Sequence, residues 1–271
     1  MTKPRIAASS YLNTAPLCYS FLQGRQKDSC RFLSDAAPAR CADLLRAAEA
    51  DAALIPVIEY QRIPGLRVVP GISVSSMDSV RSVILASRTP IESVRTVALD
   101  TSSRTSAVLV QIILTQFYRL APAYTSSPPN VRAMLEKNDA ALIIGDPAIL
   151  VDRSRLVVYD LAEEWRKHTG LPFVFAFWAV RADSLGWYNR PDAAVDFAEA
   201  KREGIVQIPD IAREYSASLG LEQADLVRYL TENISFDLGG ESLRALNLYY
   251  RLAFDCRLID KVVDVSFMPK Q

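Results

Sequence analysis

The sequence reads DAALI at residues 51–55 and reads DAALI again at residues 139–143. Each copy follows a segment in which apolar residues recur with the spacing of an amphipathic helix, at 37–50 and at 131–135. We interpret each copy as the core strand of a separate lobe, because short continuous apolar runs are typical of buried strands. No third copy occurs in the sequence, which excludes a fixed-period solenoid. The repeat therefore predicts the same topological position in two lobes, with or without an internal duplication.

Other short apolar runs alternate with helical patterns over the first 180 residues. With the two DAALI segments, these runs lie at 5–9, 30–33, 52–57, 82–87, 96–100, 140–145 and 173–180. Alternation of this kind predicts βαβ units, and therefore an α/β fold with mainly parallel sheets covered by helices.

The chain of 271 residues is longer than a usual single domain, which favours two lobes. We expect a discontinuous first lobe of residues 1–87 plus 181–271 and a second lobe of residues 88–180. The segments 82–88 and 173–181 are the expected crossings, and two crossings form a hinge that permits closure around a ligand. Beyond Ala182 the pattern becomes mostly helical, and these helices are expected to return to the first lobe, at 191–203, 210–219, 223–232 and 241–254.

Composition excludes several classes of function. Lys plus Arg and Asp plus Glu both number 31, so no overall positive field favours nucleic acid or an anionic membrane. No apolar stretch reaches the roughly 18 to 20 residues of a membrane span. A strand-like segment begins at Arg5 without the apolar core of a secretory signal, so we expect a cytoplasmic protein. The four cysteines have no metal-binding or redox spacing, and we expect buried thiols and no metal site.

The strongest candidate for a binding site lies between the strand at 96–100 and the apolar helix expected from Ala107. It contains several hydroxyls and one guanidinium in consecutive positions: Ser102, Ser103, Arg104, Thr105 and Ser106. Unpaired N–H groups at a helix start favour an anion, and these side chains add donors, so we expect a carboxylate or phosphate to bind here. The simpler alternative is that Thr101 or Ser102 only caps the helix.

The first lobe has a counterpart after its first strand. Residues Ser10, Tyr11 and Asn13 again lie between a strand and a helix, where ligands of open α/β sheets bind. The alternative is a capped helix with Tyr11 packed at its edge. Donors on both lobes would suit a small molecule with two carboxylates.

Isolated residues add weaker candidates. Ser82 and Ser87 flank the first crossing, and Gly145 follows the second DAALI copy, where a glycine allows close approach of a ligand. Glu59 and Asp146 are the carboxylates best placed to face a cleft, although an Asp before Pro often only starts a turn.

Other kinds of catalytic centre are not indicated. The only histidine, His168, precedes a helix stop at Gly170, where a cation is explained by the helix dipole. The sequence contains no convincing Ser-His-Asp set, and neither GxGxxG nor GxxxxGK[ST] occurs, so no nucleotide cofactor is expected.

Several ordered motifs resemble a known family. They are Ser10–Asn13 with Pro16, Ile55–Tyr60, Ser79–Ser87, Ala98–Asp100 with Ser103–Ser106, Gly145–Asp146, and Thr169–Ala176 before Trp178. Together they resemble the chorismate dehydratase (MqnA) family of the futalosine route to menaquinone. The resemblance implies a type II periplasmic-binding-protein-like fold. It also implies a carbon–oxygen lyase that dehydrates chorismate to 3-[(1-carboxyvinyl)oxy]benzoate without a cofactor.

Under this resemblance, Asn13 and Ser82 are the catalytic candidates that position the substrate and hydrogen-bond the departing hydroxyl. The base is expected to be the enolpyruvyl carboxylate of the substrate itself, because the candidate site is rich in donors and poor in titratable groups. Glu59 and Asp146 are the alternatives on the protein.

Four rival functions share parts of this pattern. A transporter's solute-binding protein would be expected to carry an export signal or a lipid-anchor cysteine, and a transcription regulator's effector domain would need a helix-turn-helix. The related 1,4-dihydroxy-6-naphthoate synthase is disfavoured by the Tyr-Leu-Asn signature and by the position of His168. A non-catalytic binding protein for a small carboxylate is the fourth.

Overall fold

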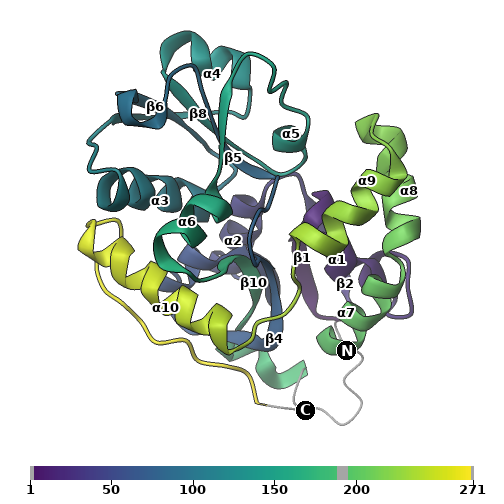
Figure 1. Cartoon of the computed structure of the whole chain (residues 1–271). Coiled ribbons are helices and arrows are strands. Elements are labelled where there is room, and N and C mark those ends of the chain that lie inside the picture. Colours follow the sequence, from purple (N-terminus) through teal and green to yellow (C-terminus); the bar gives the residue numbers. More distant parts are fainter. Residues whose placement is uncertain (1–2, 188–194, 270–271) are drawn as a thin grey trace.

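The computed structural model describes residues 3–187 and 195–269 and contains two five-stranded sheets (Figure 1). The first sheet has the order β2 (Arg31–Asp35), β1 (Arg5–Ser9), β3 (Ala52–Pro56), β10 (Phe173–Arg181) and β4 (Leu66–Ser76). The second has the order β7 (Ala123–Ser127), β6 (Thr96–Asp100), β8 (Ala140–Ile144), β5 (Val83–Ser87) and β9 (Val157–Asp160).

The two DAALI copies form β3 and β8, the central strands of the two sheets, which confirms their predicted roles. Even the register agrees: Ala52 is paired with Ile6 of β1, and Ala140 is paired with Val97 of β6. Strand β8 is buried on both faces, because Leu142 packs into the main core while Ile143 packs into a second cluster behind the sheet. Burial on both faces explains why the run is continuously apolar.

The sheets are mixed rather than mainly parallel. In each, four of the five strands point in the same direction, and the remaining strand, β10 or β5, runs antiparallel to both of its neighbours. The antiparallel direction follows from the connections, because β10 enters the first sheet from the second lobe and β5 enters the second sheet from the first.

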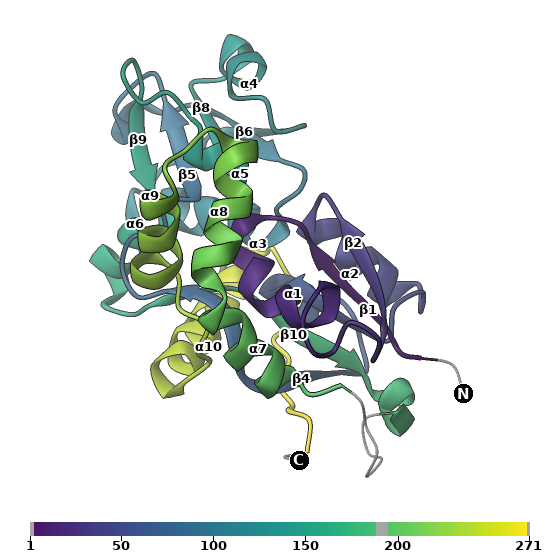
Figure 2. The ribbon, with the colours of Figure 1, turned by 90° about the vertical axis from the view of Figure 1, so that its right-hand side faces the viewer.

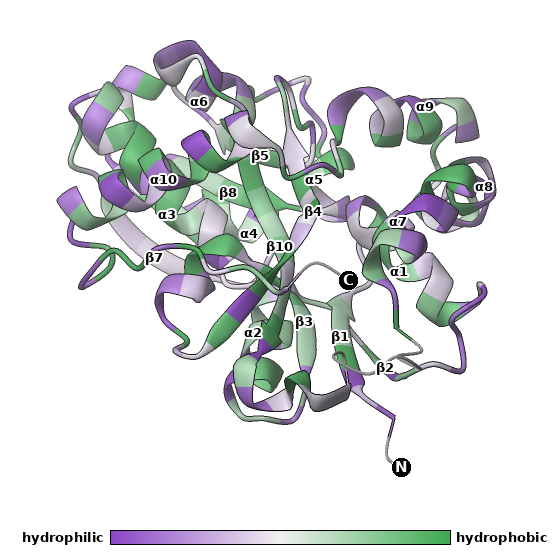
Figure 3. Ribbon diagram, turned by 90° about the horizontal axis from the view of Figure 1, so that it is seen from below, coloured by the Kyte–Doolittle hydropathy of each residue, from purple (hydrophilic) through white to green (hydrophobic). Residues whose placement is uncertain are grey.

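Helices cover the sheets as the alternation predicts. In the first two thirds of the chain they are α1 (Ala15–Leu22), α2 (Pro38–Arg46), α3 (Arg104–Ile112), α4 (Val131–Lys137), α5 (Asp146–Ile149) and α6 (Leu161–Thr169). Short 3₁₀ turns occur at Leu12–Thr14, Val57–Gln61, Ile91–Ser93 and Ala182–Trp187, and a π turn at Ile113–Phe117. Figure 3 shows hydrophobic residues concentrated on the strands and both polar and apolar residues on the helices.

The C-terminal part is helical, as expected. It contains α7 (Phe197–Val206), α8 (Ile208–Leu219), α9 (Gln223–Arg228), a π turn at Tyr229–Asn233, and α10 (Gly240–Asp255). The start expected at 191 lies outside the described residues. Helix α7 packs on α1 (Figure 2), whereas α10 contacts both β10 of the first sheet and α3 of the second lobe. No helix in the described parts of the chain is long and apolar enough to span a membrane.

The chain passes between the sheets twice, once between β4 and β5 and once between β9 and β10. The expected division, 1–87 plus 181–271 against 88–180, assigned β5 to the first lobe and treated β10 as a crossing. Pairing shows β5 wholly in the second sheet and β10 wholly in the first. We therefore propose that the lobes divide within 77–82 and 161–172.

Candidate functional site

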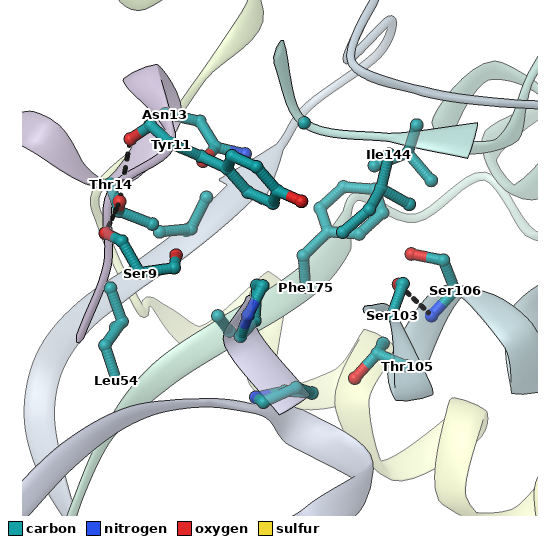
Figure 4. A pocket seen from close by; sticks show the side chains of 16 residues that line it. Ser9, Tyr11, Asn13, Thr14, Leu54, Ser103, Thr105, Ser106, Ile144 and Phe175 are labelled. Carbon is teal, nitrogen blue, oxygen red and sulfur yellow. Dashed lines mark hydrogen bonds between the residues drawn. The ribbon is translucent and has the colours of Figure 1, made fainter. Parts of the chain in front are cut away.

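A pocket lies where the two lobes meet, and residues of both lobes line it. Figure 4 shows its polar walls: Tyr11 and Asn13 lie on one side, and Ser103, Thr105 and Ser106 on the other. The lining residues are Ser9, Tyr11, Asn13, Thr14, Pro38, Leu54, Pro56, Val74, Val83, Ser103, Thr105, Ser106, Ile144, Gly145, Phe175 and Ala176.

The wall from the first lobe is the turn that links β1 to α1. The Thr14 hydroxyl donates to the carbonyl oxygens of Ser9 (2.7 Å) and Tyr11 (2.8 Å), which fixes the turn. Asn13 lines the pocket, and its Oδ1 is buried yet accepts no hydrogen bond from the described residues. A buried amide oxygen without a donor is costly, by about 1–3 kcal/mol, so it points to a ligand that supplies one.

The wall from the second lobe is the start of α3. Ser103 is the N-cap of α3, and its Oγ accepts from the Ser106 N–H at 3.3 Å. The residue that caps the helix is therefore Ser103 and not Thr101 or Ser102. Thr105 Oγ1 accepts from the Ile58 N–H of the first lobe at 3.3 Å. Because Thr105 and Ser106 line the pocket as well, hydroxyls remain available beside the helix start, where the dipole favours an anion.

Ser102 and Asp100 form a buried pair beside this wall. Ser102 donates both its N–H (2.8 Å) and its hydroxyl (2.5 Å) to Asp100 Oδ1, while Asp100 Oδ2 accepts from the Ile144 N–H at 3.3 Å. Burial raises the pKa of Asp100. Ser102 does not line the pocket; its hydroxyl instead accepts from the Tyr11 hydroxyl across the lobes at 3.5 Å.

Arg104 is not at the pocket. Its guanidinium donates to Glu59 Oε2 and to both oxygens of Asp43, each at 2.9 Å. Glu59, whose side chain is 1% exposed, also pairs with Arg46 and Arg62. Arg104 therefore joins the second lobe to the first through a buried carboxylate, which differs from the expected role as a ligand for the substrate.

The segment after β8 meets the first lobe directly. Gly145 has a φ of +65° and lies against the Tyr11 ring, so closely that a β-carbon there would come within 2.7 Å of ring carbons. Asp146 accepts from the Leu12 N–H at 3.0 Å but does not line the pocket. Burial raises the pKa of Asp146 to about 6, although the Leu12 N–H acts in the opposite direction.

The serines expected at the hinge and the cleft have protein partners. The buried Ser82 hydroxyl accepts from Tyr229 at 2.6 Å, and the Ser82 carbonyl accepts from the Gly145 N–H at 2.7 Å. Ser82 is next to Val83, which lines the pocket, but does not line it itself. The Ser10 carbonyl accepts from Tyr215 of α8 at 2.7 Å, and Ser87 donates to the Thr89 carbonyl at 2.7 Å.

The apolar part of the pocket was not predicted from the sequence. Leu54 and Pro56 come from β3, Val74 from β4, and Phe175 from an irregular point in β10. In the sequence these residues stand out only because they lie in apolar runs, and an apolar run does not distinguish a pocket wall from the core. Together with the hydroxyls they give the pocket an apolar part and a polar part.

His168 lies outside this site. Its ring stacks on Phe117 with centroids 4.5 Å apart, in the last turn of α6, and Gly170 ends that helix with a φ of +72°. The expected helix stop is thus confirmed. Within the described residues, no group of three His, Cys, Asp or Glu side chains could hold a metal ion.

Structural neighbours share the fold. A protein of Archaeoglobus fulgidus solved by X-ray crystallography aligns with a TM-score of 0.75 and 19% identity, covering 95% of this chain and 98% of that one. The periplasmic aliphatic sulphonate-binding protein of Escherichia coli aligns with a TM-score of 0.64 and 19% identity, covering 98% and 96%. These matches confirm the two-lobed fold similar to periplasmic binding proteins.

Sequence relatives are more specific. A chorismate dehydratase of Thermus thermophilus is 31% identical over 240 residues, covering 81% of this chain and 84% of the relative. A chorismate dehydratase of Campylobacter jejuni is 32% identical over 132 residues, covering 47% and 55%. The family described as menaquinone biosynthesis matches residues 4–255. The chain therefore belongs to this menaquinone biosynthesis family, as its resemblance to the chorismate dehydratases predicts.

Proposed function

We propose that the protein is a hydro-lyase that converts chorismate into 3-[(1-carboxyvinyl)oxy]benzoate and water, in the cytoplasm, as a step of the futalosine pathway. The activity of the two named relatives supports this assignment. The observation that carries it is Asn13 Oδ1, a buried acceptor in the wall of a pocket between the lobes, for which residues 3–187 and 195–269 supply no donor. The hydroxyl of chorismate is a donor of the kind that this oxygen lacks.

The rest of the pocket is compatible with the same ligand. Chorismate has a six-membered ring and two carboxylates. Leu54, Val74 and Phe175 offer an apolar surface to the ring, and Thr105 and Ser106 offer hydroxyls beside the start of α3 to a carboxylate. We assign no cofactor, since the reaction changes no oxidation state overall.

The reaction breaks two bonds and makes the ring aromatic. The C–H bond of the ring carbon that bears the enolpyruvyl ether breaks, and its electron pair becomes part of the new ring π system. The neighbouring C–O bond breaks, and the hydroxyl leaves with its electrons. One proton is lost from the ring carbon to the base and one is taken up by the hydroxyl, so the net loss is one water. Asn13 holds this hydroxyl in place, and Ser82 is the proposed second positioning group next to the pocket wall.

The candidate bases on the protein fit this reaction poorly. Glu59 does not line the pocket, and its carboxylate is used in ion pairs with three arginines. Asp146 binds the Leu12 N–H and does not line the pocket. These contacts favour the enolpyruvyl carboxylate of the substrate as the base, held close to the reacting C–H bond by the closed lobes.

The direct test is to incubate purified protein with chorismate and follow the ultraviolet absorbance of an aromatic product, with mass spectrometry to show the loss of one water. Catalytic amounts of protein should consume all of the chorismate. Tight binding of chorismate without product would contradict the proposal and would identify a non-catalytic binding protein instead.

A further inference from the structure

Asp146 makes a contact between the lobes that neither capping nor catalysis explains. It follows β8 in the second lobe, and its Oδ1 accepts from the main-chain N–H of Leu12, which belongs to the first lobe, at 3.0 Å. Leu12 immediately precedes Asn13 in the same 3₁₀ turn, Leu12–Thr14. The position of Asn13 in the pocket is therefore tied to a carboxylate on the opposite lobe.

The other contacts of this turn do not replace that one. Thr14 bonds within the turn itself, and Tyr215 of α8 bonds the Ser10 carbonyl on the side of the first lobe. Towards the second lobe, the Tyr11 hydroxyl reaches Ser102 only at 3.5 Å. The bond from Leu12 to Asp146 is thus the shorter of these two hydrogen bonds from the turn to the second lobe, and its acceptor is a carboxyl group.

We propose that Asp146 is a positioning residue that sets Asn13 in the closed pocket through the Leu12 N–H, and that it is not the base of the reaction. What Asn13 does to the substrate rests on the proposed function. The contact itself does not, because it concerns only how the two lobes meet.

The charge of Asp146 links this contact to pH. The ionisable groups that sense it are Tyr11, Tyr215 and Tyr229; burial raises the pKa of each, and the Asp146 charge raises it further, so none titrates near neutral pH. Burial raises the pKa of Asp146 itself to about 6. In an open cleft, where water reaches the carboxyl, the pKa returns towards about 3.9.

The sign of this linkage follows from the two states. The closed state has the higher pKa, so closure takes up a proton, and lowering the pH through 6 favours the closed arrangement. Above pH 6 the buried negative charge opposes closure. Both the protonated carboxyl and the carboxylate can accept the Leu12 N–H, so the hydrogen bond does not require the charge.

An amide side chain separates the two candidate roles of Asp146. Asp146→Asn keeps a carbonyl acceptor for the Leu12 N–H and removes the charge, whereas Asp146→Ala removes both. A positioning role predicts that Asp146→Ala lowers kcat about tenfold and that Asp146→Asn recovers most of this loss. It also predicts that the pH dependence of kcat/KM near 6 disappears in Asp146→Asn. Equal, near-complete loss of turnover in both variants would overturn the proposal, because it would identify a base.

A second measurement does not depend on turnover. In protein labelled with ¹⁵N-leucine, the Leu12 amide resonance, assigned with Leu12→Met, should shift with a midpoint near pH 6. It should lose this titration in Asp146→Asn. A Leu12 amide resonance whose chemical shift changes neither with pH nor with the Asp146 substitutions would overturn the proposal. If the wild type makes no product while this resonance titrates, the proposed function fails and the contact stands.

The matched control is Asp139→Asn. Asp139 also accepts main-chain N–H groups, from Arg95 and Thr96 at 2.9 Å, but it does so inside the second lobe. The proposal expects this variant to leave the titration of Leu12 and the pH profile of the wild type unchanged. A loss of either in Asp139→Asn as well would overturn the specific role of Asp146.

Discussion

The ring of Tyr11 in the first lobe lies against the backbone of Gly145 in the second. A β-carbon at Gly145 would come within 2.7 Å of the Cδ2 and Cε2 carbons of that ring. Gly145 also has φ +65° and ψ −149°, a conformation that is open essentially only to glycine. This position therefore needs glycine both for its own backbone and for the closure of the lobes.

Gly145→Ala should keep the cleft from closing. We expect backbone strain of about 1–3 kcal/mol in the free energy of unfolding, measured with urea. We also expect at least a tenfold weaker affinity for the reaction product, measured by titration calorimetry, because the Tyr11 ring can no longer take its place.

Gly71→Ala separates these two effects. Gly71 has φ +75°, so an alanine there is strained as well, but nothing lies within 4 Å of the added carbon. This variant should lose stability and keep its affinity for the product. Equal affinities in the two variants would show that the contact between Tyr11 and Gly145 does not control closure.

Asn13→Ala should separate stability from activity. The buried Asn13 Oδ1 has no donor among the residues that the structure describes, so its removal should raise the free energy of unfolding of the free protein by about 1 kcal/mol. Turnover should fall about a hundredfold, as for other single polar groups that contact a reacting centre. Urea unfolding and the chorismate assay measure the two effects.

Asn138→Ala is the matched control for this substitution. Asn138 is also buried, but its amide donates to the Met134 carbonyl and its oxygen accepts from Thr125. This variant should lose stability and retain turnover. If Asn13→Ala behaves in the same way, Asn13 has a structural role only.

Arg104→Ala should act on stability and closure rather than on a direct ligand contact. The substitution removes one of three arginines around the buried Glu59 and the bridge to Asp43. Because two arginines remain, we expect a loss of about 2 kcal/mol in urea unfolding, below the cost of a fully unpaired charge. Arg202→Ala, at an exposed pair with Glu199, should cost under about 1 kcal/mol. Equal losses would show that the ion pairs of Arg104 contribute no more to stability than an exposed ion pair does.

The strands could be predicted from the sequence because their signal is local. The run AALII at 140–144 is apolar at every position, which is the pattern typical of a strand buried on both faces. The sequence does not predict which sheet β5 (Val83–Ser87) joins, because the residues of β5 are equally apolar whichever strands they pair with. Its partners, β8 and β9, lie more than fifty residues away along the chain.

The site could be predicted in part for the same reason. The hydroxyls of Ser103, Thr105 and Ser106 gather at a helix start, which the sequence reveals, and all three line the pocket. The direction of the Arg104 side chain is not local information. Its partners Asp43 and Glu59 lie 61 and 45 residues away in sequence, and only the meeting of the lobes brings them together.

Ser82 and Tyr229 provide a last test, because both are buried and each is the other's partner. Burial raises the pKa of Tyr229, so its hydroxyl remains a donor at neutral pH, and it donates to Ser82 Oγ at 2.6 Å. Ser82→Ala therefore leaves the Tyr229 hydroxyl without an acceptor, at a cost of about 1–3 kcal/mol. Tyr229→Phe removes the donor, and the double variant removes both groups.

The double variant should consequently lose less stability than the sum of the single variants, by about 1 kcal/mol in urea unfolding. Turnover should follow a different order. The Ser82 hydroxyl accepts from Tyr229, so its own proton is free to be donated to the substrate. Ser82→Ala removes this donor and Tyr229→Phe does not, so Ser82→Ala should lower kcat more. Additive stabilities together with equal kcat values would mean that the pair only fills space beside Val83, and that the departing hydroxyl of chorismate is held by Asn13 alone.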